Sequence, residues 1–201
     1  MSKRIIRNVF ITVAGSIAML LLLSGCSSMF IGSGTVTNQD RAVDEFDRIV
    51  FSGAGEVTIK FADRYSVIVT ADDNTQQHIK MNAEDGVLTI SMDVKTVRAT
   101  KLSIDITMPT LTAIDMEGAG SITLGDGSAD NLAVKLSGVG SIDATRYQIK
   151  NASVNLEGVG TLKVWATESL SGKLSGVGQL VYKGSPTLNV DHEGLGNIVR
   201  Q

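Results

Sequence analysis

The stretch KLSGVGSI at residues 135–142 returns almost unchanged as KLSGVGQL at residues 173–180. Two similar stretches, MEGAGSI at 116–122 and LEGVGTL at 156–162, share its Gly-x-Gly centre. The first glycines of all the copies are Gly53, Gly118, Gly138, Gly158, Gly176 and Gly194, and the last five follow one another at spacings of 20, 20, 18 and 18 residues. A repeat of this length indicates that one short structural unit is stacked several times.

Apolar residues hold constant positions in the repeat. From Phe46 onward the sequence alternates apolar and polar residues, the pattern of β-strands. Two residues before each first glycine stand Phe51, Met116, Leu136, Leu156, Leu174 and His192, and between the glycines stand Ala54, Ala119, Val139, Val159, Val177 and Leu195. A β-solenoid needs such columns, because each coil buries its inward side chains only by stacking on its neighbours. We therefore expect an all-β, single-domain β-solenoid over residues 45–201 with coils of about 18–20 residues, in which Leu136, Val139 and Ile142 fill the core.

The polar positions of the repeat form two outward columns. One contains Glu117, Ser137, Glu157, Ser175 and Glu193, and the other contains Asp115, Lys135, Asn155, Lys173 and Asp191. In neither column do like charges fall on adjacent coils, as cross-strand pairing favours. If function resides in the repeats, we expect its surface contacts at Lys135, Asn155, Lys173 and Glu157.

The Gly-x-Gly pattern does not indicate a phosphate-binding loop. A dinucleotide fingerprint needs a third small residue three positions after the second glycine, at the start of a helix. Here that position holds Thr58, Thr123, Asp143, Lys163, Val181 or Val199, and a strand follows. We expect the glycines to allow a positive φ or a close approach of neighbouring coils at a repeated corner.

The chain resembles the head GIN domain family, described as auto-transporter adhesin domains with a β-helical body. The resemblance lies in the repeats, in GSGTVTNQDRAVDEFDRIVFSGAGEVTI (32–59), in VIVTADDN (67–74) and EDGVLTI (84–90), and in LVYKGSP (180–186). It implies a surface-protein class for nearly all of the chain after residue 26.

The N-terminus reads as a bacterial lipoprotein leader. Basic Lys3, Arg4 and Arg7 precede an uncharged apolar run from Val9 to Leu23, which is typical of a secretory signal. A retained transmembrane anchor is less favoured, because the run is shorter than the ~20 apolar residues that a span needs. Leu23-Ser24-Gly25-Cys26 resembles the lipobox. We expect a signal peptide at residues 1–25 and a lipidated Cys26 followed by a tether over residues 26–44, part of which docks on the domain.

The leader and the charge balance also set the expected location. By resemblance to the sorting rule of Gram-negative lipoproteins, Ser27 directs the protein to the outer membrane. Two or three acyl chains on Cys26 would anchor it firmly, and as the only cysteine Cys26 cannot form an internal disulfide. Without the three basic residues of the leader, the chain has 15 basic and 21 acidic side chains. This excess of negative charge argues against a nucleic-acid partner.

Other candidate sites in the sequence are weak. Asp126, Ser128 and Asp130 imitate the start of a calcium loop, but Asn131 replaces the required glycine. His192 lies in an apolar column of the last repeat, where we expect a polar cap and not a catalytic residue. We expect no cofactor and no metal site.

Trp165 is the sole tryptophan and falls on the outer side of its strand by alternation. Together with Tyr147 it could form a small glycan-binding platform, although packing beneath a neighbouring loop is the favoured interpretation. The sequence thus predicts a non-catalytic outer-membrane lipoprotein, an adhesin or scaffold whose partners are a polysaccharide, an envelope protein or another copy bound through open solenoid edges. The alternatives are an enzyme acting on polysaccharide, which would need paired carboxylates in a cleft, and an envelope stress or assembly factor.

Overall fold

The computed structural model describes residues 30–93, 97–98 and 101–201. Ile31–Gln201 form one compact unit. The expected signal peptide and the lipidated Cys26 lie outside the described residues. In the described part, no helix is long and apolar enough to cross a membrane.

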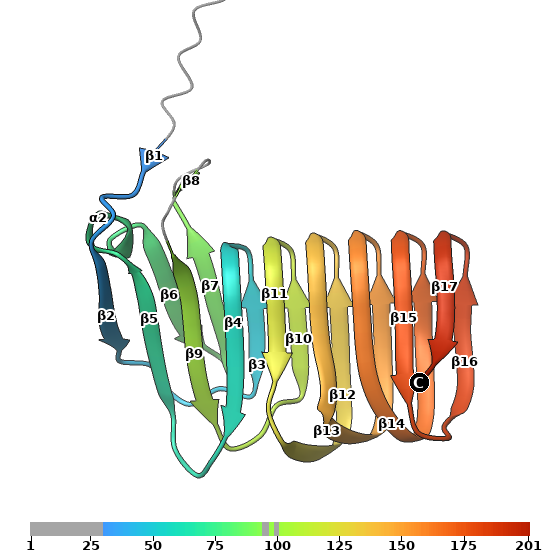
Figure 1. Cartoon of the computed structure of the whole chain (residues 1–201). Helices are drawn as coiled ribbons and strands as arrows, with labels where there is room; N and C mark the ends of the chain where they lie inside the picture. The colour runs from blue at the N-terminus through green and yellow to red at the C-terminus, as the bar shows by residue number, and fades with distance from the viewer. Residues whose placement is uncertain (1–29, 94–96, 99–100) are drawn as a thin grey trace, which may run out of the picture. The chain divides into compact units, whose positions relative to one another are not determined.

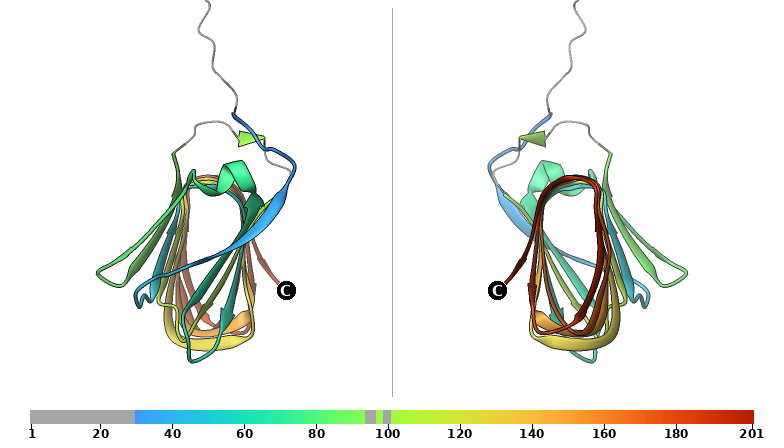
Figure 2. Two further views of the ribbon diagram at one scale, coloured as in Figure 1. Left: turned by 90° about the vertical axis from the view of Figure 1, so that its left-hand side faces the viewer. Right: turned by 90° about the vertical axis from the view of Figure 1, so that its right-hand side faces the viewer.

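Two rows of parallel strands make up most of the unit and form the coils of the β-solenoid that the sequence predicted (Figure 1). The row that precedes the Gly-x-Gly bends contains β7 (Val87–Met92), β3 (Arg48–Phe51), β10 (Ala113–Met116), β12 (Gly127–Leu136), the second halves of β13 (Val139–Leu156) and β14 (Val159–Leu174), and β16 (Thr187–His192). The row that follows the bends contains β9 (Leu102–Met108), β4 (Ala54–Phe61), β11 (Ala119–Leu124), the first halves of β13 and β14, β15 (Val177–Lys183) and β17 (Leu195–Arg200). Viewed along the stack, the coils lie one behind another (Figure 2). The fold is a β-solenoid.

The register of the strands confirms the columns read from the sequence. Val139 pairs with Val159, Val159 with Val177, and Val177 with Leu195. Even the isolated early copy is in register, since Ala54 pairs with Ala119 across 65 residues of sequence. Like positions of successive repeats therefore lie one above another at the usual strand spacing of about 4.8 Å.

A long insertion between the first and second coils closes one end of the stack. It contains β5 (Ser66–Asp72), the short helix α2 (Asp73–Gln76), β6 (Ile79–Glu84), β7 and β9. β7 and β9 stack on the far side of the first coil, and β6 and β5 then pair antiparallel with them. β2 (Val36–Arg41) pairs antiparallel with β5, so this part of the expected tether is built into the domain. Two short strands, β1 (Phe30–Ile31) and β8 (Val97–Arg98), complete the set.

The core is formed by the predicted columns, except for the column between the two glycines, whose members are all exposed: Ala54, Ala119, Val139, Val159, Val177 and Leu195. Leu136 and Ile142 are fully buried, as are their counterparts in neighbouring coils, among them Leu156, Leu162, Leu174 and Leu180. Val139 was predicted to lie with them, but 59% of its surface is exposed. Val139 lies between the two glycines, at the corner where the two strand rows meet, and its side chain is on the outside of this corner. The expectation of a buried Val139 is therefore wrong.

The glycines at the corner are required by the close approach of the coils, as expected. Gly140 has a φ of +148°, and a Cβ there would lie 1.8 Å from the carbonyl oxygen of Gly120 in the next coil. A Cβ at Gly138 would lie 1.9 Å from the carbonyl oxygen of Gly118. The same carbonyl oxygen accepts a hydrogen bond from the backbone N–H of Val139 at 3.0 Å. No side chain larger than hydrogen fits at either position without separating the coils.

Candidate functional site

The predicted polar contacts lie together on the face that precedes the bends. The register places Lys135 beside Asn155 and Asn155 beside Lys173. Lys135 lies 3.4 Å from Asp115 and Lys173 lies 2.7 Å from Glu193. The Asn155 side-chain amide donates a 2.8 Å hydrogen bond to Glu157.

These charges are matched within the chain. The charge of Asp115 is the main cause that raises the pKa of Lys135 above its usual value, and the hydrogen bond to Glu193 raises the pKa of Lys173. Asn155 likewise already donates to Glu157. A ligand on this face would have to compete with these internal partners, so the face is less available than the sequence suggested.

An exposed apolar ridge runs along the bends beside this polar face. It consists of Val139, Val159, Val177 and Leu195, which are 59%, 50%, 48% and 75% exposed. Since these four residues are on successive coils in register, the ridge extends for about 14 Å at the usual strand spacing. Soluble proteins bury most side chains of this kind, and an ordered apolar row bordered by polar residues is typical of an interaction surface. We refer to these four residues as the bend ridge.

Trp165 and Tyr147 do not form a platform. Tyr147 is buried, and its ring stacks on that of Phe61 with 4.3 Å between the centroids. Trp165 is half-buried, and the ammonium of Lys183 lies 3.8 Å from the centre of its ring. The glycan platform is therefore not formed. The strand irregularity between Ala144 and Gln148 changes the alternation of inward and outward residues here.

A polar groove crosses successive coils at the turns opposite the bends. Its volume is about 490 Å³, and its lining residues are Thr110, Ser128, Ala129, Asp130, Gln148, Lys150, Thr167 and Glu168. The Lys150 ammonium lies 2.7 Å from Asp130, whose hydrogen bond is the main cause of the raised pKa of Lys150. Asp126 nearby is bound by Arg146, which lowers the pKa of the Asp126 carboxyl. The carboxylates of the calcium-like stretch are thus engaged by basic side chains.

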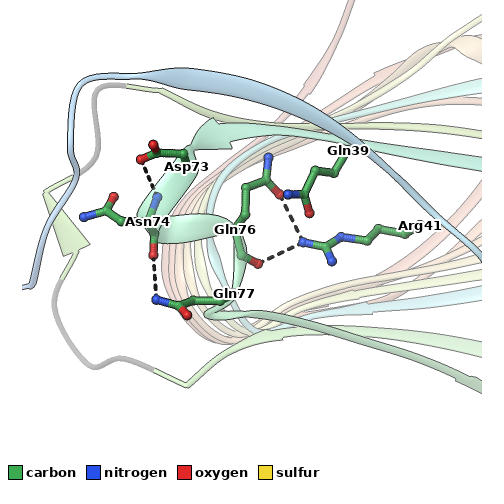
Figure 3. Close-up of a pocket in the computed structure, with 6 residues that line it drawn as sticks. All are labelled: Gln39, Arg41, Asp73, Asn74, Gln76 and Gln77. Atoms are coloured by element: carbon green, nitrogen blue, oxygen red, sulfur yellow. Dashed lines mark hydrogen bonds between the residues drawn. The ribbon is translucent and has the colours of Figure 1, made fainter.

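A second polar hollow lies at the closed end of the stack, between β2 and α2 (Figure 3). Its volume is about 560 Å³, and it is lined by Gln39, Arg41, Asp73, Asn74, Gln76 and Gln77. Arg41 Nη2 donates to the backbone oxygen and to the Oε1 of Gln76, at 2.8 and 3.0 Å. Gln76 is itself buried and donates to the backbone oxygens of Thr37 and Val69. These bonds attach β2 and α2 to the domain and seal this end.

The histidines give no sign of a catalytic centre. His78 Nδ1 lies 2.7 Å from Asp93, and this hydrogen bond is the main cause of the lowered pKa of the Asp93 carboxyl. His192 is exposed on the last coil, in register with Leu174. Within residues 30–93, 97–98 and 101–201 no group of three His, Cys, Asp or Glu side chains could hold a metal ion.

Comparisons with known proteins agree with this geometry. The family model described as "putative auto-transporter adhesin, head GIN domain" matches residues 45–126 and 114–186. The chain is similar to a crystal structure of a "putative adhesin" from Bacteroides fragilis NCTC 9343, with 25% identity, a TM-score of 0.61, and coverage of 86% of this chain and 100% of that one. A "putative adhesin" from Parabacteroides merdae ATCC 43184 shares 15% identity with a TM-score of 0.43, over 86% of this chain and 99% of that one. A comparison with curated protein sequences gave no match.

Proposed function

The chain belongs to the head GIN domain family, described as a putative auto-transporter adhesin, and on that premise we propose that it is a non-catalytic adhesin lipoprotein. In this proposal Cys26 carries the lipid anchor, the outer membrane is its location, and the target is contacted along the bend ridge. The family description supports a surface or envelope role. The leader sequence supports the lipid anchor.

The observation that carries the proposal is the exposure of four apolar side chains in register on one edge of the stack. A folded domain exposes such a row at a cost in solubility, which is offset when a partner covers it. The regular spacing suits a partner that makes many modest contacts along the stack.

The chemistry of the ridge favours a protein target over a polysaccharide. Sugars are recognised by aromatic rings and by hydrogen-bonding groups, whereas the ridge offers only valine and leucine methyl groups. The one tryptophan lies beneath Lys183. We therefore propose an envelope or cell-surface protein as the partner. The chain without its leader has 15 basic and 21 acidic side chains, which favours a partner that is neutral or basic at this surface. No observation in the described residues favours the enzyme or the stress-factor alternative.

The anchor is tested by labelling cells that express the full-length chain with palmitate. We expect label in the outer-membrane fraction, and none in the Cys26→Ser variant. An unlabelled parent chain would contradict the anchor.

The contact surface is tested by attachment of cells displaying the full-length chain to two coated surfaces, one of outer-membrane proteins and one of capsular polysaccharide. We expect attachment to the protein coat, and a several-fold loss in the Val159→Asp, Val177→Asp double variant. The matched control is Ser153→Asp with Ser171→Asp, which adds the same charge on two adjacent coils of the neighbouring face. Equal loss in both variants, or attachment to the polysaccharide alone, would contradict the proposed contact.

A further inference from the structure

The C-terminal end of the stack is open. β16 pairs only with β14, and β17 pairs only with β15. In the described part of the chain, each of these six-residue strands therefore has one edge without a strand neighbour. Figure 1 shows both at the end opposite β2 and β5. An unpaired edge exposes a row of backbone N–H and C=O groups and is a template for pairing with another strand.

The core columns continue into this open end. Leu188 is in register with Leu170, and Ile198 is in register with Leu180. Leu170 and Leu180 are fully buried, whereas Leu188 is 45% exposed and Ile198 is only half-buried. The expected polar cap is present only in part. His192 and Arg200 are polar and exposed, but Leu188 and Ile198 in the same coil are apolar.

The two ends of the stack therefore differ. At the other end the antiparallel strands β2, β5 and β6 and the helix α2 close the core, with Gln76 buried and hydrogen-bonded. Stacked repeats need an end that does not expose their core. Within the described residues such a closing layer lies on one side only, so the last coil presents two uncovered strand edges.

We propose that the open coil, β16 and β17, is a self-association surface that pairs tail to tail with the same coil of a second copy. The two edges belong to two strand rows about 10 Å apart. A single partner strand would cover one edge and leave the other exposed. A second copy presents two edges of the same length at the same separation, and a two-fold axis brings them together in antiparallel direction.

The charge of the surface is compatible with self-pairing. Asp191 and Arg200 contribute opposite charges to the edge strands, and Glu193 is already paired with Lys173. Two copies therefore meet here without net repulsion, although the chain as a whole is acidic. Strands of about 20 Å on two rows bury roughly 400 Å² per copy, about half of a standard interface. A single pair therefore binds with low affinity, and many pairs acting together bind with high avidity.

The position of the open end gives the pairing a function, and this step rests on the proposed anchor at Cys26. Nine residues separate Cys26 from β2, a span of about 32 Å at most. β2 belongs to the closed end, so the chain that leads to Cys26 joins the domain at that end, and the open coil is at the other end of the stack. A tail-to-tail pair carries its two anchors at opposite ends and links two membranes. The chain would thus be an adhesin for copies of itself on an apposed cell.

Disulfide crosslinking in intact cells tests this, because Cys26 is the only native cysteine. The full-length chain receives Asn189→Cys and Asn197→Cys, which place thiols on both edge strands. The matched control is Ser153→Cys with Thr161→Cys, at the same positions two coils further in. Two cell populations with different epitope tags are mixed and oxidised. We expect dimers that carry both tags from the edge pair and none from the control pair.

A disrupting variant completes the test. Leu188→Lys places an inward-facing charge in the open end, a known means of blocking edge pairing, and its expected result is loss of the crosslinked dimer. Val36→Lys adds the same charge at a similarly exposed apolar position in β2, at the closed end and outside the bend ridge, and is expected to leave the dimer intact.

Three results would overturn the inference: no dimer from the edge pair at equal display, equal dimer from the control pair, or crosslinks to a different protein. Dimers of a single tag would overturn the link between membranes. Dimers of the parent chain through Cys26 would show a free thiol and so contradict the anchor, while the edge result would stand on its own.

Discussion

Replacing Gly140 with alanine is expected to destabilise the stack strongly at its bend. The added Cβ would lie 1.8 Å from the carbonyl oxygen of Gly120, and side-chain carbons essentially never approach closer than 3.0 Å. The two coils must therefore separate by more than an ångström at a point where their backbones are hydrogen-bonded, for example from Val139 N–H to Gly118 at 3.0 Å.

The magnitude follows from two contributions. A positive φ costs a residue with a Cβ about 1–2 kcal/mol. Loss of about two backbone hydrogen bonds, at about 1 kcal/mol each, adds about 2 kcal/mol. Gly140→Ala should therefore lower the free energy of unfolding by about 3–4 kcal/mol, a large part of the ~5–15 kcal/mol of a typical domain.

Urea unfolding of the Ile31–Gln201 unit, followed by circular dichroism, measures this loss. The control is Gly34→Ala, because Gly34 has a φ of +86° but an added Cβ there would meet no atom within 4 Å. Its cost should be confined to the backbone contribution of about 1–2 kcal/mol. If Gly140→Ala cost no more than Gly34→Ala, close packing of the coils would not be the reason for the glycine.

Two further predictions concern the outer surface. Burial raises the pKa of the Asp143 carboxyl. The hydroxyl and N–H of Thr145 and the Lys163 ammonium together lower this pKa by more than burial raises it, so the pKa lies below the usual 3.8 in the folded chain. Its stabilisation is present above that value and is lost as the pH falls through the lowered pKa. Asp143→Asn should therefore cost roughly 1 kcal/mol in urea unfolding at neutral pH and nothing in strong acid; an equal cost at both would contradict this. Lys183→Ala should increase the quenching of Trp165 fluorescence by acrylamide, because Lys183 covers the indole ring; unchanged quenching would mean that other groups shield it.

Most of the repeat architecture could be predicted from the sequence because the columns repeat at nearly constant spacing. The exception was the column between the glycines, for example Val139. Its apolar character suggested the core, yet counting alternate residues from Leu136 or from Ile142 places it on the outside, where the structure has it. Alternation was therefore the signal that could have revealed the bend ridge.

The closed end could not be predicted in the same way. The chain runs from the first coil into β5, α2, β6, β7 and β9 and then returns to the other side of that coil. These strand pairings join segments that differ in sequence and are far apart along the chain. The segments lack the repeated motif, so its columns of equivalent residues do not predict these pairings. Tyr147 is similar: it is buried because of a local irregularity in strand pairing, which alternation alone does not reveal.

Photo-crosslinking from the bend ridge in living cells tests the central claim most directly. A photoreactive residue in place of Val159 in the full-length chain should capture an envelope or cell-surface protein. The same residue in place of Ser153, which is exposed on the neighbouring face, should capture little. Equal capture from both positions, or capture from neither at equal display, would contradict the claim that the bend ridge is the contact surface.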